Sequence, residues 1–514
     1  MFIRVYAGAI SGIDAVRVTV EVNMAESGLG LWLVGLPDNT IKESQERIRS
    51  AFENSSLSMP GKKMVVNLAP ADLRKEGSGF DLPIAMGILA SSGQIQSAKL
   101  EGAMILGELS LDGSVSPIKG ALPLAASAKD QGFKRIILPI ENSAEAAVVE
   151  GIEVLGVSNL RQIVDWANDL EQIEPAHAIT FDERQQMGLY YDDFSDVKGQ
   201  SQVKRAFEIA AAGGHNIIMI GPPGSGKTML SKRLPTILPP MSQQEALETT
   251  KIYSVAGKLG VQSGLMTTRP FRAPHHITSQ VAIIGGGNNP QPGEVSLANN
   301  GILFLDELPE FGRGVLEVLR QPLEEKSITI ARARYTVEYP ANFTLVASMN
   351  PCPCGYYNHP TKECTCSAGA VHRYLGKISG PLLDRIDLHV EVSPLSIQQI
   401  NEEREEESSA VIRERVVRAR AIQTKRFAGL EQLLVRTNAM MTSRMLRDFC
   451  PLDGPSRKML EMAMERLQLS ARAYDRIIKV ARTIADLDGE EQILSLHIAE
   501  AIGYRSLDRD SWGR

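Results

Sequence analysis

The chain has 514 residues, of which 43% are hydrophobic and 23% are charged, and its formal net charge is −6. This length allows two to four domains, each with its own hydrophobic core, and the acidic balance excludes a general polycation. Any nucleic-acid contact must therefore come from local basic patches. The first residues lack a basic stretch followed by an apolar segment, and no apolar run approaches the roughly 18 residues that a membrane span needs. We expect a cytoplasmic protein without a membrane segment.

The amino-terminal 167 residues, 1–167, are predicted to form an α/β domain. Apolar and polar residues alternate over 16–22, which is the pattern of a half-buried strand. An amphipathic helix is predicted over 38–52, and Asp112-Gly113 between alternating residues predicts a hairpin over 109–118. The other predicted elements are strands at 63–68, 135–139 and 152–157 and helices at 81–92 and 119–131.

A linker is predicted over residues 168–191, where the hydrophobic pattern decays into acidic and polar residues. A second α/β pattern occupies residues 192–395, and residues 396–514 are predicted to be helical. The first part of that helical region, 396–427, is densely charged, and we interpret the charge run as a solvated helix face. Apolar residues at helical spacing predict three or four shorter helices over 440–510.

A short apolar strand is predicted at 217–220, and a glycine-rich segment follows it directly. That segment consists of Gly221, Pro222, Pro223, Gly224, Ser225, Gly226, Lys227 and Thr228. It fits the phosphate-loop pattern G-x-x-x-x-G-K-[ST] between a strand and a helix. The glycines let backbone N–H groups surround phosphates, Lys227 neutralises phosphate oxygens, and the Thr228 hydroxyl ligates Mg²⁺. ATP and Mg²⁺ are the predicted cofactors.

A second apolar strand, at 302–305, ends in Asp306 and Glu307. In a phosphate-loop ATPase the first acid holds Mg²⁺, directly or through water, and the second polarises the attacking water. Asn350 follows a further strand, at 343–349, and is placed to orient that water. We therefore predict that these three side chains act with the phosphate loop in ATP hydrolysis.

Two arginines extend the set of candidate catalytic residues. Arg385 stands between Asp384 and Asp387, where a surface ion pair is the simpler alternative. Arg472 begins a helix of the C-terminal region and is placed to reach a nucleotide.

The nucleotide motifs occur together with three further segments, Asp193 to Gln200, Ser348 to Pro351 and Leu383 to Arg385. In combination they resemble the magnesium-chelatase-like AAA+ family, and most closely its ComM/YifB subfamily, over nearly the whole chain. The resemblance implies a P-loop AAA+ core and a C-terminal helical lid, assembled as a hexameric ring. It also implies that Asn350 is sensor 1, that Arg385 is an arginine finger acting on a neighbouring subunit, and that Arg472 is sensor 2.

In function, the resemblance implies an ATP-driven DNA motor, a hexameric helicase that promotes branch migration of recombination intermediates. It implies a role in homologous recombination of incoming DNA during natural transformation, with single-stranded and branched DNA and recombination proteins as partners. Three alternatives stay open: a metal-insertion ATPase as in magnesium chelatase, a protein-remodelling ATPase or ATP-dependent peptidase, and a slow regulatory switch. The first is disfavoured because no D-x-S-x-S segment follows the helical region.

Two segments of the ATPase domain are candidates for DNA contact. The first, a Gly/Pro-rich stretch that starts at 269–276, contains Arg269 and Arg272 among aromatic residues; its alternative is a structural loop. By the resemblance it is the helix-2 insert of the ring pore. The second is a predicted hairpin at 327–339, with Arg332 and Arg334 at its tip, which resembles the pre-sensor-1 hairpin. Six copies would form a positive collar for a phosphate backbone, and solvated surface charges are the alternative.

Four of the five cysteines lie in one short segment, which argues against a disulfide framework. They form a C-x-C…C-x-C arrangement at Cys352, Cys354, Cys364 and Cys366. Four thiolates on a polar segment are able to surround Zn²⁺ tetrahedrally, with His359 as an alternative ligand. A reduced, metal-free loop is the competing interpretation.

The amino-terminal domain resembles the Lon-protease-like fold (ribosomal S5 domain 2-like) at residues 77–83 and 107–118. Peptidases of that type use a serine and a lysine as a catalytic dyad. Gly79 stands at the position of the serine, and Leu122 at that of the lysine. We expect a non-catalytic domain that aids ring assembly or contacts DNA.

Overall fold

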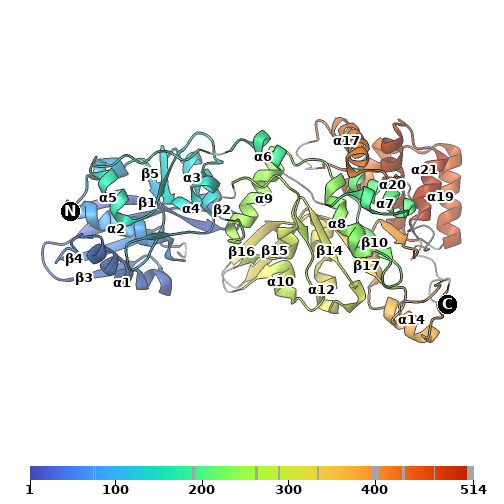
Figure 1. The fold of residues 1–514 in the computed structure, drawn as a ribbon, viewed down its shortest axis with the longest axis horizontal. Helices are drawn as coiled ribbons and strands as arrows, with labels where there is room; N and C mark the ends of the chain where they lie inside the picture. Colours follow the sequence, from blue (N-terminus) through green and yellow to red (C-terminus); the bar gives the residue numbers. More distant parts are fainter. Residues whose placement is uncertain are drawn as a thin grey trace.

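The computed structural model describes residues 1–72, 75, 77–177, 179–187, 192–260, 264–287, 290–332, 335–359, 361–394, 405–430, 435–467 and 469–505. Figure 1 shows an amino-terminal α/β part, a central α/β part and a helical part that follow one another along the long axis. Within the described ranges, no helix is long and apolar enough to cross a membrane.

The amino-terminal part is built on a seven-stranded sheet with the order β3-β4-β2-β1-β5-β8-β9. Its strands are β1 (Phe2–Ser11), β2 (Asp14–Met24), β3 (Gly30–Val34), β4 (Lys63–Ala69), β5 (Ala103–Ile105), β8 (Arg135–Pro139) and β9 (Glu153–Val157). Its helices are α1 (Asn39–Asn54), α2 (Asp81–Ser91), α3 (Ala121–Asp130), α4 (Ile140–Ala146) and α5 (Leu160–Ala167). The predicted alternation is confirmed, because Val18, Val20 and Val22 of β2 are fully buried. The predicted hairpin is confirmed as β6 (Glu108–Leu109) and β7 (Val115–Ser116).

A short helix, α6 (Phe181–Met187), lies inside the range predicted as a linker. Phe181 packs against a small buried cluster of the central part, which gives this polar segment an apolar anchor. The two α/β parts also touch directly. The Gly120 N–H donates to the Ser254 carbonyl (3.1 Å), and the Ser254 hydroxyl bonds the buried Glu145 carboxylate.

The central part carries a five-stranded parallel sheet with the order β11-β14-β17-β10-β18. Its strands are β10 (Ile217–Ile220), β11 (Phe271–Arg272), β14 (Ile302–Leu305), β17 (Thr344–Met349) and β18 (Leu388–Glu391). These strands are continuous apolar runs because both faces are covered: Ile217 packs into one core and Ile218 into another. The carboxyl ends of all five strands meet at one edge, where ligands bind in such sheets.

The helices of the central part are α7 (Ser201–Gly213), α8 (Lys227–Ile237), α9 (Gln243–Val255), α10 (Gln280–Ile284), α11 (Glu294–Leu297), α12 (Arg313–Val318), α13 (Arg320–Glu325), α14 (Ala368–Leu375) and α15 (Gly380–Leu383). Two hairpins stand beside the sheet: β12 (Gly285–Gly286) with β13 (Gln291–Pro292), and β15 (Ser327–Arg332) with β16 (Tyr335–Pro340). The second confirms the hairpin predicted at 327–339. The side chain of Arg332 and the whole of Arg334 lie outside the described residues.

The carboxyl-terminal part consists of α17 (Ser409–Arg426), α18 (Ser443–Phe449), α19 (Gly454–Leu467), α20 (Ala471–Asp488) and α21 (Ser495–Gly503). Helices α17 and α20 pack against α7 of the central part. The prediction of a solvated charged face holds for Arg418, which is exposed. It is wrong for Arg415 and Arg420, because Arg415 pairs with Glu208 of α7 and Arg420 donates to the Ala211 carbonyl (2.9 Å).

Candidate nucleotide-binding site

The phosphate loop joins the end of β10 to the start of α8, at the carboxyl edge of the parallel sheet. Gly224 and Gly226 have φ angles of 78° and 86°, in the left-handed region that favours glycine. A Cβ at Gly221 would lie 2.4 Å from the Val392 carbonyl oxygen, whereas a Cβ at Gly224 would meet no atom within 4 Å. The loop is therefore tight on one side and open above Gly224, which is the shape of a phosphate cradle.

Lys227 is the first residue of α8 and is almost fully buried. Its ammonium group donates to the carbonyl oxygens of Gly221 (2.7 Å) and Pro222 (3.0 Å) and to Oδ1 of Asn350 (3.3 Å). Burial lowers the pKa of Lys227, and the two acids that follow β14 oppose this shift. The structure thus brings the predicted phosphate-binding lysine and the predicted sensor into contact.

Asp306, directly after β14, has hydroxyl partners on two sides. Thr228 Oγ1 donates to Asp306 Oδ2 (2.9 Å), and the Ser348 hydroxyl bonds Asp306 Oδ1. A hydroxyl and a carboxylate in contact beside a phosphate loop are the oxygen ligands that Mg²⁺ uses in such sites. Ser348 is not among the predicted site residues. The signal for it is its position two residues before Asn350, on a strand that pairs with β14.

Glu307 has a φ of 53°, a left-handed conformation that is uncommon outside glycine. Its side chain is 53% exposed, and its Oε2 lies 3.5 Å from Nδ1 of His276. In the sequence, His276 lies in the stretch predicted to contact DNA, and it is not among the predicted residues of the ATP site. The structure brings it to Glu307 because β11 neighbours β14, so the segment that follows β11 reaches the same edge of the sheet.

These residues fit ATP with Mg²⁺. The glycine cradle offers backbone donors, Lys227 offers a buried cation, and Thr228 with Asp306 offers oxygen atoms for the metal. Glu307 stands on the exposed side, where water has access, and Asn350 stands beside the lysine. The arrangement is suited to phosphoryl transfer to water.

Arg385 and Arg472 lie near the amino ends of the strands, on the side of the sheet opposite the phosphate loop. Arg385 precedes β18, whose last residue, Glu391, pairs with Ile220 just before the phosphate loop. The four residues of β18 span roughly 13 Å, which separates Arg385 from the loop of its own chain. Burial lowers the pKa of Arg385, and the nearby positive charge of Arg472 contributes to this shift. Arg476, four residues after Arg472 on α20, pairs with Asp387, two residues after Arg385. Arg472 therefore lies on the same side of the sheet as Arg385, near the amino ends of the strands.

The Arg385 side chain is only 5% exposed. It donates to the Pro381 carbonyl (2.5 Å) and pairs with the carboxylate of Glu324. Among the residues that the structure describes, its Nε has no hydrogen-bond partner. The Arg385 guanidinium is therefore buried, with one N–H donor that has no partner among the described residues. The alternative inferred from the sequence, an ion pair at the surface, does not describe this environment.

The predicted DNA contacts Arg269 and Arg272 are both engaged within the chain. Arg269 donates to the carbonyl oxygens of Pro239 and Asn300, each at 2.7 Å. Arg272 forms a two-point ion pair with Glu294, at 2.7 and 2.9 Å. Both guanidinium groups therefore stabilise the central part.

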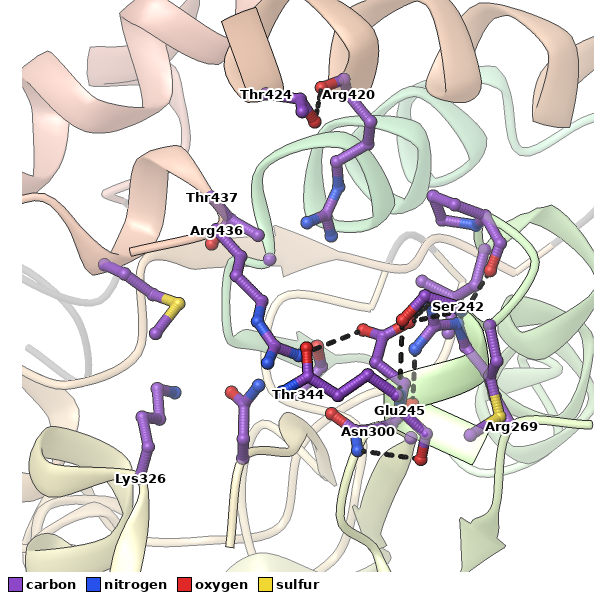
Figure 2. Close-up of a pocket in the computed structure, with 18 of the residues that line it drawn as sticks. Ser242, Glu245, Arg269, Asn300, Lys326, Thr344, Arg420, Thr424, Arg436 and Thr437 are labelled. Carbon is purple, nitrogen blue, oxygen red and sulfur yellow. Dashed lines mark hydrogen bonds and ion pairs between the residues drawn. The ribbon is translucent and has the colours of Figure 1, made fainter. Parts of the chain in front are cut away.

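Arg269 also lines a cavity of about 700 Å³ between the central part and the carboxyl-terminal helices. Figure 2 shows Lys326, Arg420 and Arg436 pointing into this cavity from different sides. Thr344, the first residue of β17, is part of its lining, so the cavity lies at the amino ends of the strands. It is separate from the nucleotide site at the carboxyl ends.

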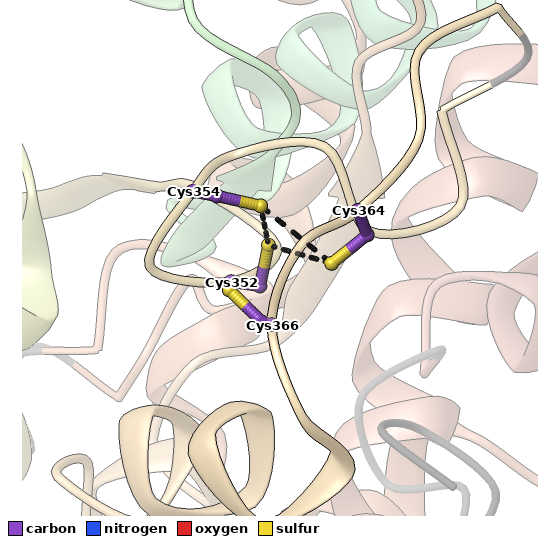
Figure 3. Close-up of side chains that lie close together, drawn as sticks. All are labelled: Cys352, Cys354, Cys364 and Cys366. Carbon is purple, nitrogen blue, oxygen red and sulfur yellow. Dashed lines mark hydrogen bonds between the residues drawn. The ribbon is translucent and has the colours of Figure 1, made fainter.

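The four cysteines of the C-x-C…C-x-C arrangement come together, as Figure 3 shows. Sγ of Cys352 lies 3.3 Å from Sγ of Cys354 and 3.7 Å from Sγ of Cys364, and all four sulfur atoms lie within 4.8 Å of one another. All are free thiols. His359 is not part of this cluster; its Nδ1 accepts hydrogen bonds from backbone N–H groups, including that of Lys362 (3.1 Å). The cluster is compatible with one metal ion.

The positions predicted to have lost peptidase residues lie among apolar side chains. A Cβ at Gly79 would lie 3.5 Å from Cγ2 of Ile118, and Leu122 is 1% exposed on α3. The neighbouring Ser78 hydroxyl bonds Glu108.

Three family profiles match the chain. The family described as "Subunit ChlI of Mg-chelatase" matches residues 20–142. "Magnesium chelatase, subunit ChlI" matches residues 193–400, and "Magnesium chelatase, subunit ChlI C-terminal" matches residues 406–505.

Several relatives match almost end to end, two of them from Haemophilus influenzae and Escherichia coli. The "Competence protein ComM" of Haemophilus influenzae is 44% identical over 510 residues, which cover 98% of this chain and 97% of the relative. The "Uncharacterized protein YifB" of Escherichia coli is 43% identical over 510 residues, with the same coverage of 98% and 97%. A shorter match, to "Lon protease 2" of Bacillus subtilis, is 31% identical over 98 residues, or 19% of this chain and 17% of that protein. The chain therefore belongs to the magnesium-chelatase family of AAA+-type ATPases, in the group of the ComM and YifB proteins.

Proposed function

We propose that the protein is an ATP-driven DNA motor, a hexameric helicase that promotes branch migration during homologous recombination of incoming DNA in natural transformation. The relative named "Competence protein ComM" supports this proposal, because 44% identity extends over 98% of the chain. The structural observation that supports it is that Arg385 and the start of α20, which carries Arg472, lie near the amino ends of the strands, whereas their own phosphate loop lies at the carboxyl ends.

That placement argues for a ring. An arginine that stabilises the charge of a reacting phosphate must reach it directly, and Arg385 and Arg472 do not lie beside the phosphate loop of their own chain. In a head-to-tail ring, each subunit presents one edge of its sheet to the opposite edge of its neighbour. Arg385 as arginine finger and Arg472 as sensor 2 then complete the site of the next subunit.

The hydrolytic chemistry follows from the residues at the carboxyl edge. ATP supplies the phosphoryl group, and Mg²⁺ neutralises its charge, when both are bound. Lys227 binds the phosphate oxygens, while Thr228 and Asp306 hold the metal. Glu307 takes a proton from the attacking water, and Asn350, held against the lysine, orients that water.

The β15–β16 hairpin is the proposed DNA-contacting element. Its arms pair in register from Ser327 opposite Pro340 to Arg332 opposite Tyr335. We assign the contact to Arg332 and Arg334 from their position in the sequence of this hairpin. Six such tips form a positive collar that grips a phosphate backbone without reading sequence. We assign the contact to this hairpin rather than to Arg269 and Arg272, because the latter already have partners within the chain.

Two further assignments complete the proposal. The amino-terminal part is a Lon-like, non-catalytic domain that aids ring assembly or contacts DNA, and the carboxyl-terminal helices form the lid. Zn²⁺ is the ion of the four-cysteine cluster, because the thiols are free, close together and arranged around one point.

Stimulation of ATP hydrolysis separates this proposal from its alternative, a protein-remodelling or chelatase-type ATPase without DNA translocation. The purified protein is assayed with single-stranded DNA, with branched DNA and with casein. We expect stimulation by DNA and none by casein. If casein stimulates ATP hydrolysis and is cleaved to peptides, and DNA does not stimulate hydrolysis, the result would contradict the DNA motor and favour the alternative.

A further inference from the structure

The sulfur atoms of the four-cysteine loop are spaced for one tetrahedral ion. A Zn–S distance of about 2.3 Å in a tetrahedral site places the sulfur atoms about 3.8 Å apart. The separations among Cys352, Cys354 and Cys364 are 3.3, 3.6 and 3.7 Å. Binding one ion therefore requires only small movements of these side chains.

The loop is attached to the hydrolytic site at both of its ends. Cys352 follows Asn350 by two residues, and the Asn350 amide oxygen accepts a hydrogen bond from Lys227 (3.3 Å). At the other end, Cys366 immediately precedes the N-cap of α14. Tyr374 of that helix is 7% exposed and lies close to the Asn350 backbone. An ion that joins the two ends of the loop therefore holds Asn350 from both directions.

The four-cysteine loop also packs against the phosphate loop. Gly355 has a φ of 84°, and a Cβ at this position would lie 2.6 Å from Cδ of Pro223. The Gly355 N–H donates to the Cys352 carbonyl (3.0 Å), which ties this contact to the first cysteine. The contact between the two loops leaves no room for a side chain at Gly355.

The second half of this loop buries little surface. Between β17 and α14 the described residues form no helix or strand, and most residues from 361 to 367 are exposed. A polar segment of this kind does not bury enough apolar surface to offset the entropy of ordering. Metal ligation is the interaction that orders such segments.

We propose that the metal-bound four-cysteine loop is a clamp that fixes Asn350 and the phosphate loop in their hydrolytic arrangement. The inference rests on the proposed ATPase function and extends it, because hydrolysis then depends on a second metal, bound outside the nucleotide site. Loss of that metal lowers the turnover rate more than the affinity for ATP, since Asn350 orients the attacking water, whereas Lys227 and Thr228 still contact the nucleotide and its metal.

The test uses the full-length protein and two variants. Cys364→Ser removes one ligand, and Cys450→Ala removes a buried thiol among the carboxyl-terminal helices, away from both sites. Zinc per chain is measured by elemental analysis, nucleotide affinity with a fluorescent ATP analogue, and kcat by phosphate release. We expect one zinc per chain in the wild type and in Cys450→Ala. Cys364→Ser should lose zinc and about tenfold or more in kcat, with little change in affinity.

Two further experiments do not depend on the folding of Cys364→Ser: removal of zinc from the wild type with a chelator, and a second variant. Stripping zinc from the wild type should lower kcat, and adding Zn²⁺ back should restore it. Gly355→Ala keeps all four ligands but adds a methyl group against Pro223, so it should retain zinc and still lose turnover.

The outcomes separate the clamp from the function on which it rests. Loss of zinc with unchanged kcat, or unchanged kcat in Gly355→Ala, overturns the clamp while the ATPase stands. Wild-type protein that hydrolyses ATP without zinc overturns both the zinc assignment and the clamp. Zinc-loaded protein that hydrolyses no ATP counts against the proposed function, and the clamp falls with it.

Discussion

Nδ1 of His276 lies 3.5 Å from Oε2 of Glu307 and connects the segment after β11 to the acid proposed to activate water. The histidine is itself held in place, since its ring packs against the tilted ring of His275 and forms an edge contact with Phe311. The Glu307 side chain is otherwise half exposed, so its orientation depends on this contact. The stretch proposed as the helix-2 insert therefore contacts the acid that we propose to activate water.

The first prediction concerns His276. His276→Ala should lower kcat several-fold with little change in ATP affinity, because Glu307 loses the neighbour that orients it. His275→Ala, which removes the stacking partner but not the contact itself, should have a smaller effect. Single-turnover phosphate release measures both variants. Equal rates in His276→Ala and in the wild type would show that Glu307 needs no such partner.

The second prediction concerns the arginine finger. Arg385→Ala should leave ATP binding intact and lower hydrolysis by about 10³-fold, the scale at which such arginines act. If the arginine acts on a neighbouring subunit, mixing Arg385→Ala with Glu307→Gln should restore activity. Some interfaces then combine an intact Glu307 with an intact Arg385. Absence of any recovery in mixed assemblies would place the arginine's action within its own chain.

The third prediction concerns the β15–β16 hairpin. Replacing Arg332 and Arg334 with alanine should weaken binding of single-stranded DNA and reduce its salt dependence. The slope of log K against log salt should fall by about 0.7 for each phosphate contact that is lost. Arg418→Ala, at an exposed arginine of α17, serves as the matched control. Unchanged affinity and slope in the double variant would remove the hairpin from the DNA path.

The fourth prediction concerns the buried carboxylate that precedes β18. Asp387 is 2% exposed and bonds Arg476 of α20 and His215 (3.2 Å). Burial alone would raise the pKa of Asp387, but the positive charge of Arg476 and the hydrogen bond with His215 lower it well below its ordinary value. The ionised carboxylate therefore contributes stability above about pH 4 that is lost as the pH falls further.

Arg476→Ala should accordingly destabilise the protein by about 3–5 kcal/mol at pH 7, because it leaves a buried charge unpaired. The difference from the wild type should shrink as the pH approaches 4, because burial raises the pKa of Asp387 once Arg476 is removed, and the carboxylate of the variant is then neutralised by protonation while that of the wild type stays ionised. Urea unfolding at both pH values measures this, with Arg161→Ala, at an exposed helical ion pair, as the control. A loss of stability that does not depend on pH would contradict the role given to Asp387.

Much of the nucleotide site could be predicted because its signals are local. The phosphate loop is contiguous, and Asp306 and Asn350 each follow an apolar strand, so parallel pairing brings them to one edge. The cysteine cluster was likewise visible in the spacing of four residues within one short segment. Elements with strong alternation, such as β2, were found at nearly the predicted positions.

The residues that sequence analysis missed depend on the order of strands or on packing between distant segments. His276 reaches Glu307 only because β11 is the neighbour of β14, and no local pattern states that order. Helix α6 is stabilised because Phe181 packs against a hydrophobic cluster formed by residues from other parts of the chain. Arg415 and Arg420 look solvated in sequence, but α17 packs on α7 and gives them partners there.

The central claim is that ATP hydrolysis drives movement along DNA. The most direct test incubates the protein with labelled three- and four-stranded DNA junctions, ATP and Mg²⁺, beside Glu307→Gln. That variant should bind ATP and form the ring but fail to turn over. We predict strand release by the wild type and none by Glu307→Gln. Intact ATPase activity without strand release at any protein concentration would contradict the account.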